Sequence, residues 1–295
     1  MIKAKLYMDT VVKIQVVTKN PEERSAAGVR VDRAFQVFHR VEQACSRFTP
    51  ESEVMKACQT VGKPVKISPF LFEPLKFALN AAELTSGEFD PAIGKLLEEH
   101  GYNRHYLTQE TIYTPLAEHG DFRDIVLDEH LQTLYLKKPL IIDLGAVAKG
   151  FAIDLAANEL RKFAGFIINA GGDVYAGGSD ENGQPWEIGI QHPKKKGRVI
   201  ETVNLSDEAI CTSGSYERMN KEIPGMHHMI SPRTKESPND LISSSVIAPF
   251  AMMADAFSTI TFLLGREKGR ELLESMNLKG LLIKNDLQID RLGGF

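Results

Sequence analysis

Two oxygen-bearing side chains, Asp255 and Thr259, stand four residues apart in an apolar segment that runs from Phe250 to Leu264. This spacing places both side chains on one face of a helix, one turn apart. A carboxylate among apolar side chains is costly to bury unless it is paired or bound to a cation. A carboxylate and a hydroxyl, completed by water or phosphate oxygens, suit Mg²⁺. The pair indicates either a magnesium site or a core carboxylate that an arginine or a neighbouring loop satisfies.

A second polar segment, Asp143 to Gly150, joins a predicted strand to a predicted helix. It places Lys149 at the start of the helix, where the positive end of the helix dipole disfavours a cation. A phosphate held there by backbone N–H groups and by Lys149 would compensate. The alternative is a surface lysine paired with Asp143 or Asp154. The segment is neither a Walker loop nor a GxGxxG motif, so its pattern alone does not decide between the two interpretations.

Three shorter motifs also allow two interpretations each. The segment from Asn169 to Asp173 contains paired glycines, which permit a tight turn or the close approach of a ring. The segment from Thr212 to Ser215 offers hydroxyls for a local turn or for a ligand. His227 and His228 precede the segment from Met229 to Thr234, and a histidine there is either structural or a general acid or base.

A sheet and several helices must position these segments. Apolar residues alternate along residues 4–17, which indicates a strand, and recur at helical spacing along residues 25–45, which indicates a helix. Gly87 is predicted to cap the C-terminus of one helix. The predicted strands are 4–17, 134–144, 166–169, 174–176 and a hairpin of 186–191 with 198–204, and the predicted helices are 25–45, 69–84, 151–163 and 250–264.

The composition is that of a folded globular protein. Of 295 residues, 43% are hydrophobic and 25% are charged, and a chain of this length buries a substantial core. The formal net charge of -4 comes from 39 acidic and 35 basic residues, which are interspersed except for the run from Lys194 to Lys196. The charge gives no reason to expect a nucleic-acid partner, and the lysine run is interpreted as a solvated loop.

Cysteine usage and hydropathy bear on the compartment. The three cysteines, Cys45, Cys58 and Cys211, form no CxxC pair, which favours a reducing compartment without disulfides. No signal peptide or lipobox is visible at the N-terminus. The apolar segment from Phe250 to Leu264 is shorter than the ~20 residues needed to cross a bilayer. We therefore predict a cytoplasmic protein without stable membrane insertion, although a targeting segment trimmed from the chain would leave no trace.

Taken in order, these segments resemble the ApbE family, the FAD:protein FMN transferases, over nearly the whole chain. Each segment is commonplace alone, but eight of them stand in the family order. The blocks around Asp143 and Asp255 are the most specific. The matching segments are 8–10, 45–48, 86–91, 143–150, 169–173, 212–214, 228–234, and 254–256 with Thr259.

The resemblance implies a magnesium-dependent transfer. FAD is bound, its pyrophosphate is cleaved, and FMN is joined by a phosphoester to a threonine or serine of a target flavoprotein, with release of AMP. Mg²⁺ would neutralise the pyrophosphate and act as a Lewis acid. By the same resemblance, Asp255 and Thr259 supply side-chain ligands, the backbone carbonyl of Ala146 completes them, and Ser258 is a further ligand.

The resemblance also implies which residues surround FAD. Phe48 and Phe89 suit contact with flat rings. His228 is the candidate for handling the proton of the attacking hydroxyl. The residues implied to line the FAD site are Met8, Phe48, Glu88, Phe89, Asp90, Asp143, Lys149, Thr212 and Met229.

Three positions depart from the family pattern. The family usually has glycine where Asp9 stands, aspartate where Ser231 stands, and glycine where Lys235 stands. The change at Ser231 removes a carboxylate that would orient His228, which predicts weaker proton transfer. Asp9 adds bulk and charge beside a predicted flavin contact. The segments predicted to hold the metal and the pyrophosphate keep the family pattern.

The implied fold is α+β, similar to a T-fold, with a mixed, largely antiparallel central sheet flanked by helices. Two intertwined lobes would enclose an FAD cleft. No repeat, low-complexity tract or linker interrupts the chain, so we expect a single domain over residues 1–295.

Three functions fit these observations. The first is the FMN transferase, whose partners are FAD and an acceptor protein. The second is an FAD pyrophosphatase, in which water replaces the acceptor hydroxyl and FMN and AMP are released. The third is a flavin-binding protein without turnover. Intact FAD, free FMN with AMP, or FMN on an acceptor threonine would distinguish them.

Overall fold

A computed structural model describes residues 1–105, 108–216, 219–220, 223 and 225–295. The chain divides into two compact units, each built from separate stretches of sequence. Unit 1 comprises Met1–His39, Lys149–Glu217 and Asn239–Phe295, and unit 2 comprises Arg40–Ala148 and Arg218–Pro238. The stretches alternate along the chain, as the expectation of intertwined lobes requires. That the whole chain is a single domain stays a prediction.

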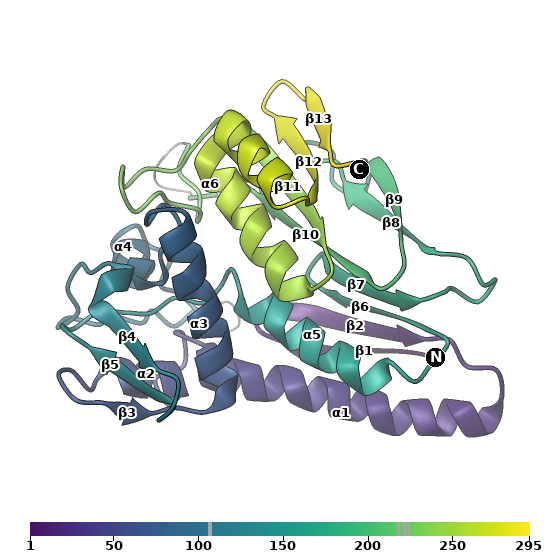
Figure 1. The fold of residues 1–295 in the computed structure, drawn as a ribbon, viewed down its shortest axis with the longest axis horizontal. Helices are drawn as coiled ribbons and strands as arrows, with labels where there is room; N and C mark the ends of the chain where they lie inside the picture. The colour runs from purple at the N-terminus through teal and green to yellow at the C-terminus, as the bar shows by residue number, and fades with distance from the viewer. Residues whose placement is uncertain (106–107, 217–218, 221–222, 224) are drawn as a thin grey trace. The chain divides into compact units, whose positions relative to one another are not determined.

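Unit 1 is organised around an eight-stranded sheet with the order β1-β2-β6-β7-β10-β11-β12-β13 (Figure 1). Every neighbouring pair of strands is antiparallel, which confirms the predicted sheet. The strands are β1 (Ile2–Tyr7), β2 (Thr10–Val16), β6 (Gly165–Ala170), β7 (Asp173–Gly178), β10 (Glu208–Gly214), β11 (Leu241–Ala248), β12 (Lys279–Lys284) and β13 (Ile289–Leu292).

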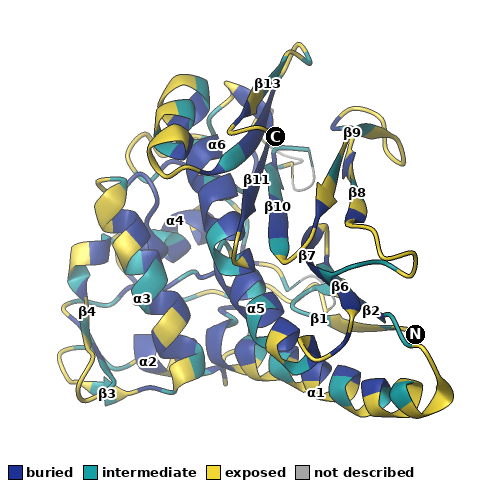
Figure 2. Cartoon of the chain, turned by 45° about the vertical axis from the view of Figure 1, so that its right-hand side comes forward, coloured by how far each residue is buried: buried dark blue, intermediate teal, exposed yellow. Residues whose placement is uncertain are grey.

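Both faces of the central strands are covered. Helix α6 (Ala251–Ser275) packs against β10 and β11 on one face (Figure 1). The antiparallel hairpin of β8 (Trp186–Gln191) and β9 (Val199–Leu205) covers the other, where Trp186, Leu205 and Ile247 share one apolar cluster. All residues of β11 are accordingly buried. In Figure 2 the first turns of α6 are likewise dark blue, whereas its C-terminal turns carry exposed residues.

Two further helices belong wholly or largely to unit 1. Helix α1 (Pro21–Cys45) follows β2, and the Asn20 side chain accepts the Glu23 N–H at its start, as an N-cap does. The helix buries Phe35 and Phe38 completely while its other side faces solvent (Figure 2). Helix α5 (Ala148–Leu160) leads into β6 and places Lys149 in its first turn.

Unit 2 contains a small sheet and five short or medium helical segments among its described residues. The antiparallel sheet has the order β3-β5-β4, and its core includes Leu134, Leu136 and the helix residues Leu71 and Leu75. The elements are α2 (Glu53–Cys58), β3 (Val65–Lys66), α3 (Pro69–Leu84), η1 (Pro91–Ile93), α4 (Gly94–Glu99), η2 (Phe122–Asp124), β4 (Ile125–Asp128) and β5 (Thr133–Leu136).

Several predicted boundaries were wrong. The helix predicted over 25–45 begins at Pro21, and the helix predicted over 250–264 continues past Gly265, whose φ and ψ are not helical, to Ser275. The predicted strand 4–17 is a hairpin, because Met8 and Asp9 adopt φ of 51° and 58°, the left-handed geometry of a two-residue turn. The predicted strand 134–144 ends at Leu136, shortly before Pro139, which has no N–H for a ladder. The helix predicted over 151–163 begins at Ala148 and ends at Leu160. The helix 69–84 and the strand 186–191 are confirmed.

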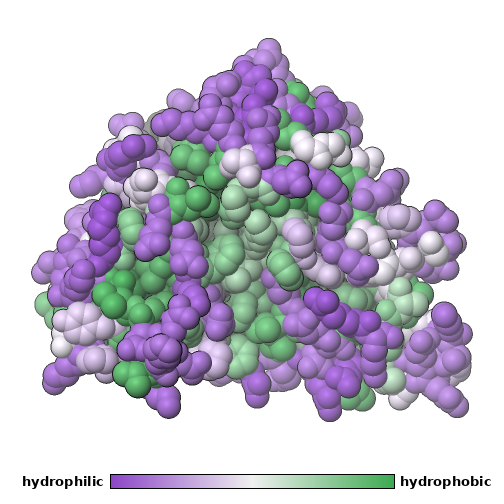
Figure 3. Space-filling view, viewed as in Figure 1, coloured by the Kyte–Doolittle hydropathy of each residue, from purple (hydrophilic) through white to green (hydrophobic). Residues whose placement is uncertain are grey.

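Hydrophilic residues predominate on the face of the chain drawn in Figure 3, with patches of apolar residues between them. Among the described residues, no helix is long and apolar enough to cross a membrane.

Candidate functional site

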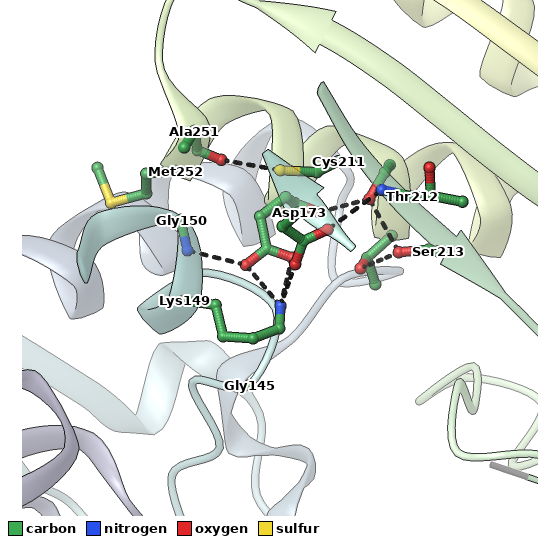
Figure 4. A network of polar contacts seen from close by, with 12 residues as sticks. Gly145, Lys149, Gly150, Asp173, Cys211, Thr212, Ser213, Ala251 and Met252 are labelled. Carbon is green, nitrogen blue, oxygen red and sulfur yellow. Dashed lines mark hydrogen bonds and ion pairs between the residues drawn. The ribbon is translucent and has the colours of Figure 1, made fainter. Parts of the chain in front are cut away.

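The N-termini of α5 and α6 each receive a carboxylate from the other helix. Asp154 of α5 accepts the N–H groups of Ala251 and Met252 at 2.7 and 2.9 Å. Asp255 of α6 accepts the N–H of Gly150 at 3.1 Å (Figure 4). Free N–H groups at a helix start favour such partners. The exchange fixes the two helix starts against each other and holds Asp255 in place.

Gly150 allows this close approach. A Cβ on Gly150 would lie 2.5 Å from the backbone carbonyl carbon of Ala251 and the Cα of Met252. Contacts of that length are sterically forbidden, so only glycine lets the two backbones pack at this distance. In Figure 4 a dashed line from the Gly150 nitrogen marks the hydrogen bond that Gly150 donates to Asp255.

The Lys149 ammonium lies between two carboxylates. Its Nζ donates to Asp173 at 2.6 Å and to both oxygens of Asp255 at 3.1 and 3.2 Å. Asp173 comes from β7, directly after the Gly171–Gly172 turn, and Asp255 from α6. Neither Asp143 nor Asp154, the partners expected for a surface lysine, is bonded to Lys149. These ion pairs connect the segment that contains Lys149 with the helix that contains Asp255, which the sequence analysis treated as two separate motifs.

Burial and charge act in opposite directions on this cluster. Asp255 is 4% exposed, and burial raises the pKa of its carboxyl to about 6 even though the Lys149 charge acts to lower it. Burial also disfavours the Lys149 ammonium, but the charges of Asp173 and Asp255 outweigh it and raise the pKa of Lys149 above its ordinary value. Lys149 therefore stays charged and supplies the cation that these buried carboxylates require.

A chain of hydroxyls connects Thr259 to the backbone of α6. Ser258 donates to the carbonyl of Asp255 at 2.8 Å, so its oxygen accepts from Ser213 at 2.8 Å. Ser213 has then used its proton and accepts from Thr259 at 2.9 Å. This order directs the proton of Thr259 toward Ser213. The oxygen of Thr259 keeps lone pairs for a cation, while Ser258, which is fully buried, is engaged on both sides.

Thr212 enters the network through its backbone. Its N–H donates to Asp173 at 3.2 Å, while its hydroxyl shares a 2.7 Å hydrogen bond with Ser245 (Figure 4). Consecutive side chains of a strand point to opposite faces, and Ser213 points toward α6. The Thr212 side chain therefore points away from α6, and its contact with FAD stays a prediction.

In unit 2, the Asp143 carboxylate accepts hydrogen bonds from two neighbouring residues. Arg47 donates through Nε to Asp143, and its other end donates to the carbonyl of Tyr102. Asp143 also accepts the N–H of Gly145 at 2.8 Å, which shapes the turn that contains Ala146. The guanidinium lies 4.2 Å from the ring centre of Phe48. Arg47, which is 7% exposed, thus joins two predicted FAD-lining residues.

The segment from Glu88 to Asp90 is largely buried in unit 2. Glu88 forms an ion pair with Arg233 at 2.5 Å. Asp90 accepts the N–H groups of Ala92 and Phe122 at 2.8 and 3.0 Å, and burial raises its pKa to about 6. Phe89 is only 7% exposed. Asp90 therefore holds the turn together, and little of the Phe89 ring is open for stacking.

The predicted histidine lies in a compact turn of unit 2. The His228 ring meets Tyr102 edge-on at 6.5 Å between centroids, and Met229 beside it is buried. The Ser231 hydroxyl accepts the N–H of Thr234 at 3.3 Å. In this arrangement the Ser231 side chain supports its own turn.

Two of the three departures from the family pattern share a backbone property. Asp9 and Lys235 adopt φ of 58° and 60°, in the left-handed region where glycine is strain-free. Glycine is therefore favoured there by backbone geometry. Aspartate tolerates this region better than most residues, whereas lysine gains no such compensation.

A divalent cation fits the donor set in unit 1. Among the described residues, no three His, Cys, Asp or Glu side chains converge as a metal cluster. A site with one carboxylate, one hydroxyl and backbone or phosphate oxygens has a different composition, and it suits a hard cation such as Mg²⁺. Asp255 and Thr259 both lie on α6, one helical turn apart, and their role as metal ligands stays a prediction.

The structure joins some predicted residues and adds others. Lys149, Asp255, Ser258 and Thr259 belong to one polar network in unit 1, whereas Ala146 and His228 belong to unit 2. Asp173 and Ser213 were within predicted motifs but had no assigned role. Arg47 and Arg233 were missed as ion-pair partners, and Asp154 was missed as the acceptor of the α6 N–H groups, because contacts between distant segments leave no spacing signal in the sequence.

Similarity to known proteins assigns the chain to a family. The ApbE family model matches residues 8–282. The chain belongs to the ApbE family. The FAD:protein FMN transferase of Haemophilus influenzae is 31% identical over 264 residues, covering 84% of this chain and 76% of that protein. The enzyme of the same name from Escherichia coli K12 is 28% identical over 283 residues, covering 89% and 80%.

Solved structures of ApbE proteins share the fold. The crystal structure of the ApbE protein of Thermotoga maritima matches with a TM-score of 0.86 and 28% identity, covering 99% of this chain and 96% of that one. The flavin transferase ApbE of Vibrio cholerae matches with a TM-score of 0.82 and 23% identity, covering 100% and 97%. These matches confirm the α+β fold expected from the resemblance.

Proposed function

We propose that this chain is a magnesium-dependent FAD:protein FMN transferase. It cleaves the pyrophosphate of FAD, joins FMN through a phosphoester to a threonine or serine of a flavoprotein, and releases AMP. The name shared by the relatives from Haemophilus influenzae and Escherichia coli supports this activity. The observation that carries it is the network of Lys149, Asp173 and Asp255, a charged polar cluster in the segments that match the family.

Asp255 and Thr259 are proposed as side-chain ligands of Mg²⁺. Asp255 is held by Gly150 and Lys149, and Thr259 presents an oxygen whose proton is directed to Ser213. The Ala146 carbonyl and Ser258 remain predicted further ligands. When bound, Mg²⁺ would supply Lewis-acid stabilisation of the charge that develops on the pyrophosphate.

Lys149 is proposed to contact the FAD phosphates. Its ammonium is fixed by two carboxylates, so its position is set before substrate arrives. The first turn of α5 adds backbone N–H groups of the kind that bind phosphate. This chain can therefore hold the pyrophosphate with a preorganised charge, which costs little reorganisation during the reaction.

The remaining assignments concern FAD and the acceptor. His228 is proposed to take the proton of the attacking hydroxyl, which raises the nucleophilicity of that oxygen. The acceptor protein is a partner of unassigned identity, and a cytoplasmic location stays a prediction. The residues proposed to line the FAD site are Met8, Phe48, Glu88, Phe89, Asp90, Asp143, Lys149, Thr212 and Met229.

Mass spectrometry of a flavoprotein acceptor tests this proposal. The acceptor is incubated with this chain, FAD and Mg²⁺, and a matched acceptor carries alanine at the modified threonine. The proposal expects FMN on the threonine, AMP in solution, and no modification of the alanine control. Free FMN and AMP without acceptor would instead indicate the pyrophosphatase, and intact bound FAD would indicate a binding protein.

A further inference from the structure

A hollow on unit 1 is lined by none of the residues assigned to flavin transfer. Its volume is about 630 Å³, within the ~300–1,000 Å³ typical of small-molecule sites. It lies where the segment after α5, strands β6 and β7, the turn before β10 and the junction of β11 with α6 meet. Its lining consists of Arg161, Phe163, Phe166, Tyr175, Gly178, Asp207, Pro249 and Phe250.

Aromatic rings form the apolar walls of this hollow. Phe166 and Tyr175 are stacked, with ring centroids 5.9 Å apart and planes inclined by 15°. Gly177 permits this, because a Cβ there would overlap the Phe166 ring. Phe250 is 55% exposed, so its ring is accessible to a ligand. Flat walls of this kind favour a planar apolar ligand.

Tyr175 contributes a hydroxyl group to the lining of the hollow. The residue is only 5% exposed, yet within the described part of the chain its hydroxyl makes no hydrogen bond. Although the residue as a whole is largely buried, its hydroxyl oxygen remains open to solvent, so it can donate a hydrogen bond to a ligand in the hollow. Burial raises the pKa of Tyr175, so the hydroxyl is protonated at neutral pH and is available as a donor.

Arg161 adds a positive charge that is not neutralised by a contact. Within the described residues its guanidinium takes part in no hydrogen bond or ion pair, although its charge acts on Tyr175 and Asp154. Asp207, the acidic residue of the lining, instead accepts the N–H of Gly178 at 3.0 Å. The hollow therefore offers one free cation and one hydroxyl donor beside aromatic walls.

We propose that this hollow binds a planar aromatic monoanion, such as an aromatic carboxylate. The carboxylate would accept hydrogen bonds from Arg161 and from the Tyr175 hydroxyl, while the ring packs against Phe166 and Phe250. A guanidinium suits a carboxylate in charge and geometry. The negative charge of Asp207 disfavours a second anionic group on the ligand.

Titration of the intact chain with 2-naphthoate tests the proposal by isothermal calorimetry and ligand-detected NMR. The neutral alcohol 2-naphthalenemethanol has the same rings without the charge. We expect 2-naphthoate to bind and the alcohol to bind about tenfold more weakly, as loss of a charge-assisted hydrogen bond predicts. Arg161→Gln should weaken 2-naphthoate by a similar factor while leaving the alcohol unchanged.

Two further variants separate the hydroxyl from the rings. Tyr175→Phe keeps the stacked ring and should weaken 2-naphthoate severalfold, whereas Phe250→Ala should weaken both ligands. Arg33→Gln removes an exposed arginine of α1 outside the hollow and serves as the charge control. Thermal melts show whether each variant folds. Because Arg161 and Phe250 are exposed, we expect Arg161→Gln and Phe250→Ala to fold normally.

The outcomes are decisive in either direction. No binding of 2-naphthoate, equal binding of the alcohol, or equal affinities of Arg161→Gln and Arg33→Gln would overturn the proposal. So would unchanged 2-naphthoate binding in both Tyr175→Phe and Phe250→Ala. The hollow and the flavin-transfer residues are tested separately, since this experiment requires neither FAD nor Mg²⁺.

Discussion

Lys149 donates hydrogen bonds to both carboxylate oxygens of Asp255, at 3.1 and 3.2 Å, across the space between two helix N-termini. The same ammonium reaches Asp173 at 2.6 Å. One positive charge thus serves two buried carboxylates. The pair links the helix that contains the proposed metal ligands to the turn that is proposed to bind phosphate.

Replacing Lys149 with methionine should destabilise the chain and make its stability depend on divalent cations. Two buried carboxylates would lose their partner, and breaking such a pair costs about 3–5 kcal/mol. The melting temperature should fall and should recover in part with Mg²⁺, because the added cation takes over the lost charge. Lys13→Met, at an exposed position of β2, is the control. A variant with unchanged stability and no response to Mg²⁺ would contradict this account of Lys149.

Gly150→Ala tests the close contact between α5 and α6. A Cβ at Gly150 would lie 2.5 Å from Met252 Cα, so we expect a loss of roughly 1–3 kcal/mol from overpacking. Gly28→Ala is the matched control, since a Cβ at Gly28 of α1 meets nothing within 4 Å. That control should gain about 0.5–1 kcal/mol from helix propensity. Urea denaturation measures both, and changes of equal sign would exclude the steric explanation.

The stability difference between the wild type and Asp154→Asn should depend on pH. Burial raises the pKa of Asp154 to about 6 in the folded chain, from 3.8. A carboxyl with a raised folded pKa stabilises the fold while it is protonated, and this contribution is lost as pH rises through about 6. The wild type should therefore lose stability relative to Asp154→Asn between about pH 4 and pH 7.

Chemical denaturation at a series of pH values provides this measurement. Glu181→Gln, an exposed change in the turn after β7, should show no comparable trend. If the difference between wild type and Asp154→Asn stays constant across the range, Asp154 does not titrate as its burial predicts.

Lys235→Gly should stabilise the chain. Lys235 adopts a φ of 60°, and a left-handed conformation costs a residue other than glycine roughly 1–2 kcal/mol. Part of this gain is offset, because glycine increases the freedom of the unfolded chain. Lys235→Ala retains the strain and should not stabilise. If thermal melts rank the two variants in the opposite order, backbone strain does not explain why the family usually has glycine at this position.

The sequence predicted local elements better than distant contacts. Pro69 and the cap after Leu84 defined α3 correctly, because both signals are local. The hairpin at Met8 and Asp9 was missed, since neither residue is a glycine although both have positive φ. The end of β5 was also missed, because two lysines and Pro139 interrupt an otherwise apolar run.

The candidate site was predicted only in part, because the sequence shows local spacing but not contacts between distant segments. Asp255 and Thr259 were found from spacing along one helix. The partner of Asp255 was not, because Lys149 lies 106 residues away. Ser213 and Asp173 joined the network through the sheet, whose strand order is not visible in the sequence. Pairings across a fold are set by topology, which spacing within one segment does not encode.

The most direct test of the central claim is Mg²⁺ binding and FMN transfer by Asp255→Ala. Calorimetry measures binding of Mg²⁺ in the presence of FAD, and mass spectrometry measures FMN on the acceptor threonine. Circular dichroism confirms that the variant is folded, and Asp180→Ala, in an exposed turn, is the control. The account predicts that Asp255→Ala loses both metal binding and transfer while the control retains both. Transfer at the wild-type rate by Asp255→Ala would contradict the assignment of Asp255 as a metal ligand.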